Sequence, residues 1–451
     1  MGNDTIDAGS HHGRPQYRPF LQFLTTQERN VIWLLLAIAF LPVDGTTLGL
    51  YALFAVYCLC NWHQLRIAAN RYLPMFLLPV ACIILSIPGW LKFGIHLNAA
   101  FMSITGLLGV LATLGAIAIA FGIKRIPWRT PLRILIASYW FSFGVGVVQW
   151  GYPSICISSR WPAISRTSCT GSTSMKARCG VVVARSSCSR SPAISACICS
   201  AYCCRLCGLC VGATVSIAKR LRNLIVVYAI GSVMMQAGTR IVLDSVVALL
   251  VAIIVHNSWC DKKQRVRGIV QLLGAVMLGL LGVLADSRLS SIAENGAEGD
   301  GSFFARIYQS LDPICGLLAH PWTVFTGYGA GNIINAVWAG AKHAERLLNG
   351  LGMNGSAAVG FASGMNADTV WTMCAYTSVV AEYGLIGLIL LVIASIVSMT
   401  RVFDTAAAEH GVWSKTVICW LVLIVYLYIQ CENYAFAALP LFIFAASKLH
   451  K

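Results

Sequence analysis

Residues 100–122 read AFMSITGLLGVLATLGAIAIAFG, a stretch without a charged side chain. As an α-helix this stretch extends about 35 Å, and the hydrocarbon core of a bilayer is about 30 Å thick. The stretch therefore predicts a transmembrane helix. Other apolar runs of 15–23 residues recur along the chain and predict further crossings.

The composition agrees with this reading. The 451 residues are 57% hydrophobic and 11% charged, with a mean hydropathy of +0.72, whereas a soluble domain is about one quarter charged. In lipid every backbone amide must be satisfied internally, which leaves helices or closed barrels. Barrels show short alternating segments, which are absent from this sequence. We therefore expect an all-α polytopic integral membrane protein.

Basic residues cluster at the ends of the apolar runs, for example at Lys124-Arg125 and Lys262-Lys263. This is the positive-inside pattern, so the net charge of +16 points to a membrane and not to a nucleic-acid partner. Alternation from a cytoplasmic N-terminus requires one further crossing between residues 150 and 219. The total is about 12 transmembrane helices. The spans read directly are 30–43, 46–62, 73–93, 100–122, 132–150, 223–238, 241–257, 268–285, 369–400, 416–430 and 434–447.

These spans divide the chain into six parts, and the longest soluble part is one large late periplasmic loop. A loop of this length inside a compact protein is usually functional. The parts are a cytoplasmic tail (1–28), a first transmembrane bundle (29–151), an anomalous segment (152–211), transmembrane helices (212–285), the periplasmic loop (286–368), and C-terminal helices with a short cytoplasmic tail (369–451).

Residues 152–211 differ from the rest of the chain. They contain 10 of its 18 cysteines, crowded among Ser and Arg. A reading-frame error in a G+C-rich gene would produce such a composition. The cysteine spacing is dense but irregular, so we do not read a zinc or iron–sulfur site from it.

Four segments in the second half of the chain, in order, resemble the O-antigen ligase and Wzy-type polysaccharide polymerase superfamily. GTRIVL (238–243) is similar to a T-S-R-G-x-L element, and RIYQSL (306–311) looks like the family's loop arginine. His320-Pro321 followed by GYGAGN (327–332), and then AEYGLIGL (381–388), look like its "HP…G-x-G" and "E-x-G" elements. The resemblance covers residues 223–447.

The resemblance implies a glycosyltransferase of the bacterial inner membrane. Such an enzyme polymerises polyprenyl-diphosphate-linked repeat units into exopolysaccharide or O-antigen at the outer face. The implied partners are the lipid-linked donor and acceptor glycans, the bilayer, a chain-length regulator and a flippase. The family's ligases often carry His-Asn where this chain has Thr372-Met373-Cys374-Ala375, which favours a polymerase over an O-antigen-type ligase.

The chemistry needs cations near the membrane surface, because the leaving diphosphate carries its own negative charge. Arg240 and Arg306 fit this role as catalytic candidates, since a guanidinium binds two phosphate oxygens and stays charged. Arg288, and less directly Arg346, are further candidates for binding anionic substrate. The loop shows no D-x-D pair, so we expect transfer without a metal or other cofactor. The alternatives are an interfacial arginine at 240 and a solvated loop charge at 306.

The acceptor hydroxyl needs a base, and His320 and Asp368 are the candidates. Their alternative roles are a turn histidine before Pro321 and a helix N-cap. Glu382 would lie within the membrane, where a carboxylate is either functional or a structural partner to Arg240 or to backbone amides.

The glycine-rich loop supplies the remaining candidates. Gly327, Gly329, Gly331 and Asn332 would bind substrate, with the loop amides directed at a diphosphate.

Two other functions compete with the polymerase. A secondary transporter would also have about twelve spans, but the chain lacks the paired broken helices typical of one. A chain with a scrambled middle segment would be inactive.

Overall fold

The computed structural model describes residues 30–40, 47–126, 129–151, 220, 223–224, 227, 231, 239–257, 259–285, 301–352, 356–367, 370, 372, 374–400, 411–430 and 438–447. Over these residues the chain is helical, with turns and no strand. The expectation of an all-α fold is confirmed for this part. The anomalous segment and most of the expected span at 223–238 lie outside it.

The described part of the first half of the chain is a series of helices. It comprises α2 (Val31–Phe40), α3 (Thr47–Cys60), α4 (Trp62–Arg71), α5 (Leu73–Phe93), α6 (Leu97–Ile117), the π-helix η1 (Ala118–Ile123) and α7 (Arg129–Gly151). The expected span at 73–93 coincides with α5. The span expected at 46–62 is wrong at its end, because α3 stops at Cys60 and a separate helix, α4, begins at Trp62.

The second half contains three groups of helices. The first is α11 (Thr239–His256) and α12 (Lys262–Ala285), and the last is α18 (Ala375–Thr400), α19 (Gly411–Gln430) and α20 (Ala438–Ser447). Between them lie α14 (Gly301–Ala319), α15 (Thr323–Thr326), α16 (Ile333–Gly350) and α17 (Ser356–Ser363). The segment expected as a long loop is therefore largely helical where it is described.

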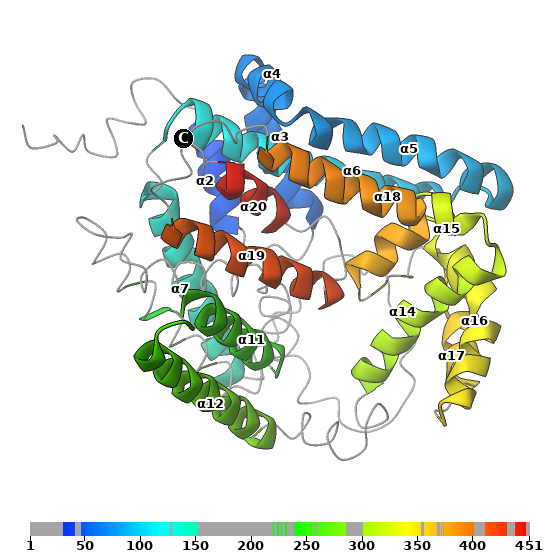
Figure 1. Cartoon of the computed structure of the whole chain (residues 1–451). Helices are drawn as coiled ribbons and strands as arrows, with labels where there is room; N and C mark the ends of the chain where they lie inside the picture. Colours follow the sequence, from blue (N-terminus) through cyan, green and yellow to red (C-terminus); the bar gives the residue numbers. More distant parts are fainter. Residues whose placement is uncertain are drawn as a thin grey trace, which may run out of the picture.

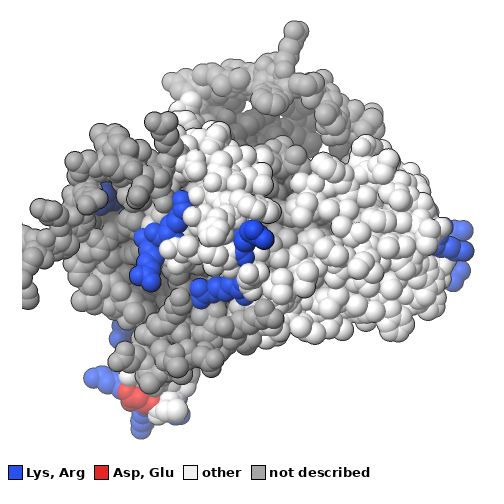
Figure 2. All heavy atoms as spheres, turned by 90° about the horizontal axis from the view of Figure 1, so that it is seen from above, with Lys and Arg blue, Asp and Glu red and all other residues white. Residues whose placement is uncertain are grey.

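Among the described residues, five helical segments are long and apolar enough to cross a membrane. They are Leu73–Phe93, Leu97–Ile123, Thr130–Val148, Lys262–Leu281 and Ala375–Met399, and four shorter apolar helices accompany them. The chain is thus compatible with a multi-pass membrane protein. Figure 2 shows the outer surface that such helices present, a broad uncharged area between groups of basic side chains.

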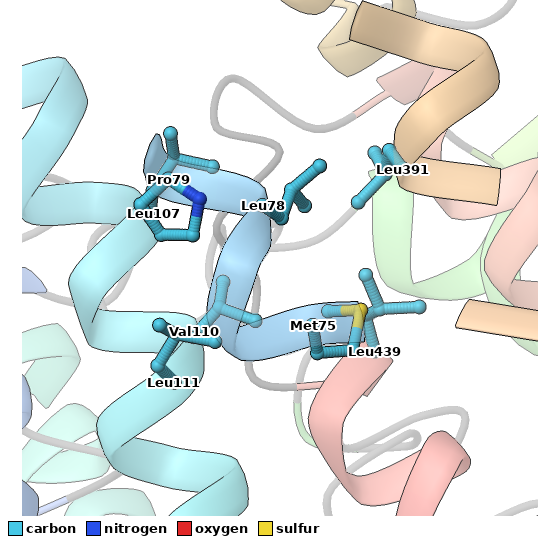
Figure 3. A pocket seen from close by; sticks show the side chains of 8 residues that line it. All are labelled: Met75, Leu78, Pro79, Leu107, Val110, Leu111, Leu391 and Leu439. Atoms are coloured by element: carbon cyan, nitrogen blue, oxygen red, sulfur yellow. The ribbon is translucent and has the colours of Figure 1, made fainter. Parts of the chain in front are cut away.

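Helices α5, α6 and α18 pack together, and α14 to α17 gather at one end of them (Figure 1). At the centre of this packing α5, α6, α18 and α20 enclose a small apolar pocket whose lining side chains point toward one another (Figure 3). Its lining includes Met75, Leu107, Leu391 and Leu439 and no polar residue. This part of the bundle core is therefore apolar.

Candidate functional site

The glycine-rich loop at 327–332 packs against a break in α18. Gly384 has φ +68° inside α18 and interrupts the helix there. A Cβ on Gly384 would lie 2.2 Å from the Phe325 carbonyl oxygen, and a Cβ on Gly327 would lie 2.3 Å from the Glu382 carbonyl carbon. Only glycine allows this approach at positive φ. The GYGAGN and AEYG motifs, which are distant in the sequence, are thus packed backbone to backbone.

The backbone amides of this loop are engaged in hydrogen bonds. Tyr328 N–H donates to the Ala381 carbonyl (2.8 Å) and Gly329 N–H to the Glu382 carbonyl (2.9 Å). These two acceptors lie just before the break in α18. The amides of the remaining loop residues donate as well: Gly327 to Thr323, Ala330 to Ser86, Gly331 to Glu382 and Asn332 to Gly329. Each of these amides therefore already has a partner in this structure, and the binding of a diphosphate by the loop amides stays a prediction.

Glu382 joins the loop to α6. Its side chain is 2% exposed, and its Oε1 accepts the Gly331 N–H at 2.9 Å. Its Oε2 accepts the Ser103 hydroxyl at 2.6 Å, and Ser103 in turn lies 2.8 Å from the Tyr383 hydroxyl. Of the two alternatives for Glu382, the contacts favour a structural partner to a backbone amide.

Helix α5 holds the other side of the loop. Ser86 Oγ accepts the Ala330 N–H at 3.0 Å, and Trp90 Nε1 donates to the Ala330 carbonyl at 3.0 Å. These two side chains lie one turn apart and bracket a single residue of the loop. A Cβ on Gly89 would lie 2.0 Å from the Tyr328 carbonyl oxygen, so α5 touches the loop backbone directly.

Asn332 closes the loop at the start of α16. Its Nδ2 donates to the carbonyls of Gly94 (2.9 Å) and Tyr328 (3.0 Å). Its Oδ1 is buried without a hydrogen-bond partner among the described residues. A buried amide oxygen in this state retains its capacity to accept a donor. Asn332 therefore combines a structural role with one unused acceptor.

His320 lies beside this loop in a group of aromatic rings. Its ring centroid is 5.4 Å from that of Phe93 and 6.1 Å from that of Tyr328. Trp322 stacks on Phe93 at 5.9 Å with the planes 8° apart, and it remains 37% exposed. Burial raises the pKa of Tyr328 to about 12, against a smaller lowering by Thr323. His320 is half-buried and lies in the same aromatic group as the partly exposed Trp322.

Of the five other predicted residues, Arg346 is exposed on α16, and the remaining four are placed less fully. Arg240 lies in the first turn of α11, and Arg306 lies on α14. Both side chains are outside the described residues, as are Arg288 and Asp368 altogether. Their roles remain predictions.

An unexpected polar group lies between α14 and α16, which cross closely. A Cβ on Gly340 would lie 1.9 Å from the Asp312 carbonyl oxygen. The Asp312 side chain is fully buried, and neither carboxyl oxygen has a hydrogen-bond partner in the described part of the chain. Burial raises its pKa to about 7. The nearby Cys315 thiol also has a raised pKa, through burial and then Asp312.

The sequence interpretation missed the residues that anchor the loop from α5 and α6. Ser86 and Ser103 are polar residues inside apolar spans, and side chains of this kind often hydrogen-bond across membrane helices. The presence of these serines inside apolar spans could therefore have indicated interhelical hydrogen bonds. Within the described ranges, His, Cys, Asp and Glu side chains do not gather in threes to form a candidate metal site.

The site as described is a hydrogen-bonded framework, with His320 and Trp322 beside it and the unused amide oxygen of Asn332 buried within it. Comparison of the chain with protein-family models, with curated proteins and with solved structures finds no match.

Proposed function

We propose that this chain is a membrane glycosyltransferase that polymerises polyprenyl-diphosphate-linked oligosaccharide repeat units at the outer face of a bacterial inner membrane. The observation that carries the proposal is the joining of two motifs, GYGAGN and AEYG, into one hydrogen-bonded unit. In this unit the Gly331 N–H donates to the Glu382 carboxyl group, although the two residues lie 51 positions apart in the sequence. The resemblance of these two motifs to one family is better supported because the motifs contact each other in the structure.

The location of this unit fits a lipid-linked substrate. The loop contacts the C-terminal end of α5 (Ser86 to Gly94) and the N-terminal end of α6 (Ala100). The basic residues Arg66 and Arg71 precede α5, and Lys124 follows α6. The loop and these basic residues are therefore about 30 Å apart along the helices. If basic ends are cytoplasmic, the loop faces outward, which supports the proposal of a periplasmic segment at 286–368 among about twelve spans.

The reaction requires a hydroxyl of the acceptor glycan to attack the anomeric carbon of the donor sugar. The new C–O bond forms as the bond to the diphosphate breaks, and the bond's electron pair leaves with the diphosphate. Arg240 and Arg306 are assigned to the departing diphosphate, because fixed guanidinium groups stabilise charge that grows in the transition state. His320 or Asp368 accepts the hydroxyl proton. Stacked Phe93 and Trp322 offer a flat apolar face beside His320.

The test is a polymerisation assay with the purified full chain and a polyprenyl-diphosphate-linked repeat unit, with products separated by length. We expect long chains from the wild type and single repeats from Arg306→Ala and His320→Ala. Lys342→Ala, an exposed residue on α16, is the matched control and should keep the wild-type length distribution. Transfer of glycan to lipid A without chain growth would instead identify a ligase. Equal products from all four proteins would contradict the assigned residues.

A further inference from the structure

Helix α4 presents an exposed face that combines aromatic, aliphatic and cationic side chains. Trp62 and Ile67 are 57% and 49% exposed, and His63 and Arg66 are exposed beside them. The opposite face is covered, with Ala68 buried and α4 packed on η1 and α6. A short helix of this composition, with its apolar and basic residues outward, is typical of one that lies in a membrane interface.

Among the described residues, the charged side chains of α4 and of the turn after η1 are all basic. Arg71 ends α4, with its guanidinium carbon 5.9 Å from the ring centroid of Tyr72, and Arg125 follows η1, which packs against α4. The sequence has no Asp or Glu from residue 45 to residue 243. Figure 2, which looks down on α4 and α5, shows Lys and Arg side chains together at one end of the uncharged surface.

The backbone holds Arg125 in place at some conformational cost. Among the described residues, Arg125 is the one non-glycine residue with positive φ, at 53°. This conformation is unfavourable for L-residues with a Cβ. The turn is fixed from both sides, because Lys124 N–H donates to the Ile119 carbonyl and Ile126 N–H donates to the Ala120 carbonyl, each at 2.8 Å. A disfavoured conformation held this firmly keeps an exposed arginine at the end of η1.

We propose that Arg66, Arg71 and Arg125, together with Trp62, form a binding surface for anionic phospholipid headgroups. The guanidinium groups would bind the lipid phosphates, and Trp62 would lie at headgroup level. This surface is distinct from the glycine-loop site, which lies at the other end of α5. It would anchor that end of the bundle at an anionic leaflet and so hold the site at a fixed depth.

The proposal is tested by lipid binding to the full-length protein in neutral detergent, followed by native mass spectrometry. Phosphatidylglycerol and zwitterionic phosphatidylcholine are titrated separately. We expect the wild type to prefer phosphatidylglycerol. Each cation near the surface contributes about a fivefold change in affinity, so the variant R66Q/R71Q/R125Q should lose about a hundredfold in phosphatidylglycerol binding and little in phosphatidylcholine binding.

Three controls keep the outcome decisive. The charge-retaining variant R66K/R71K/R125K should keep the preference, which separates lost charge from lost folding. Lys92→Gln removes an exposed cation from the last turn of α5, at the opposite end, and should have no effect. Millimolar inorganic phosphate should not displace the bound lipid, because the headgroup is held beside Trp62. A triple glutamine variant that keeps the preference, an equal loss in Lys92→Gln, or displacement by phosphate would overturn the proposal.

Discussion

Removal of the Glu382 carboxylate should destabilise the protein by several kcal/mol. In Glu382→Ala the Gly331 N–H and the Ser103 hydroxyl lose the acceptor at 2.9 Å and 2.6 Å. Hydrogen bonds to charged groups contribute about 1.5–3 kcal/mol each, so the loss is about 3–6 kcal/mol before any cavity effect. Glu382→Gln keeps one carbonyl acceptor and should lose about half as much.

The assay is thermal unfolding of the purified protein in detergent, followed by intrinsic fluorescence. We expect the order wild type, Glu382→Gln, Glu382→Ala in falling melting temperature. Glu345→Ala, a half-exposed glutamate on α16, should melt with the wild type. If Glu382→Ala unfolds at the same temperature as Glu345→Ala, the hydrogen bonds of Glu382 to Gly331 and Ser103 do not stabilise the fold, which contradicts the prediction.

Three further predictions concern backbone approach and burial. Gly384→Ala places a Cβ at φ +68° and 2.2 Å from the Phe325 carbonyl oxygen, so it should unfold several degrees below Gly360→Ala, which meets no atom within 4 Å. Gly340→Ala separates α14 from α16, because its Cβ would lie 1.9 Å from the Asp312 carbonyl oxygen. Gly350→Ala on the same helix meets open space and should be neutral or slightly stabilising in the same melting assay. The Asp312 pKa rises from 3.8 to about 7 on burial, so this group should lower wild-type stability by about 3 kcal/mol between pH 4 and pH 7. Asp312→Asn should not show this fall in stability. If the melting temperatures of the wild type and of Asp312→Asn change with pH in parallel, the prediction is contradicted.

The helices of the first half could be predicted from hydrophobic runs, because length and apolarity decide whether a segment crosses a bilayer. The expected span at 100–122 lies within Leu97–Ile123, and 73–93 matches α5. Two features escaped this reasoning. Helix α4 is too polar to count as a span, and the expected span at 369–400 begins only at Ala375 and breaks at Gly384. A break inside an apolar run leaves no mark on hydropathy.

Part of the site could be predicted as a set of motifs, but its architecture could not. The glycines at 327, 329 and 331 were expected to bind substrate, with the loop amides directed at a diphosphate. The structure uses the same glycines for close packing, because the loop meets α5, α6 and the break in α18 at once. Such contacts depend on which helices are neighbours, and one sequence does not give that. The hydroxyls of Ser86 and Ser103 take part for the same reason.

An outward-facing site requires the loop at 327–332 and helix α4 to lie on opposite sides of the membrane. Single cysteines at Phe325 and Arg66, both exposed, can be labelled on intact cells with a membrane-impermeant maleimide and compared with the unsubstituted chain. We predict added labelling at position 325 from outside, and at position 66 only after the cells are opened. Labelling at position 66 from outside, or at position 325 only in opened cells, would contradict an outward-facing site.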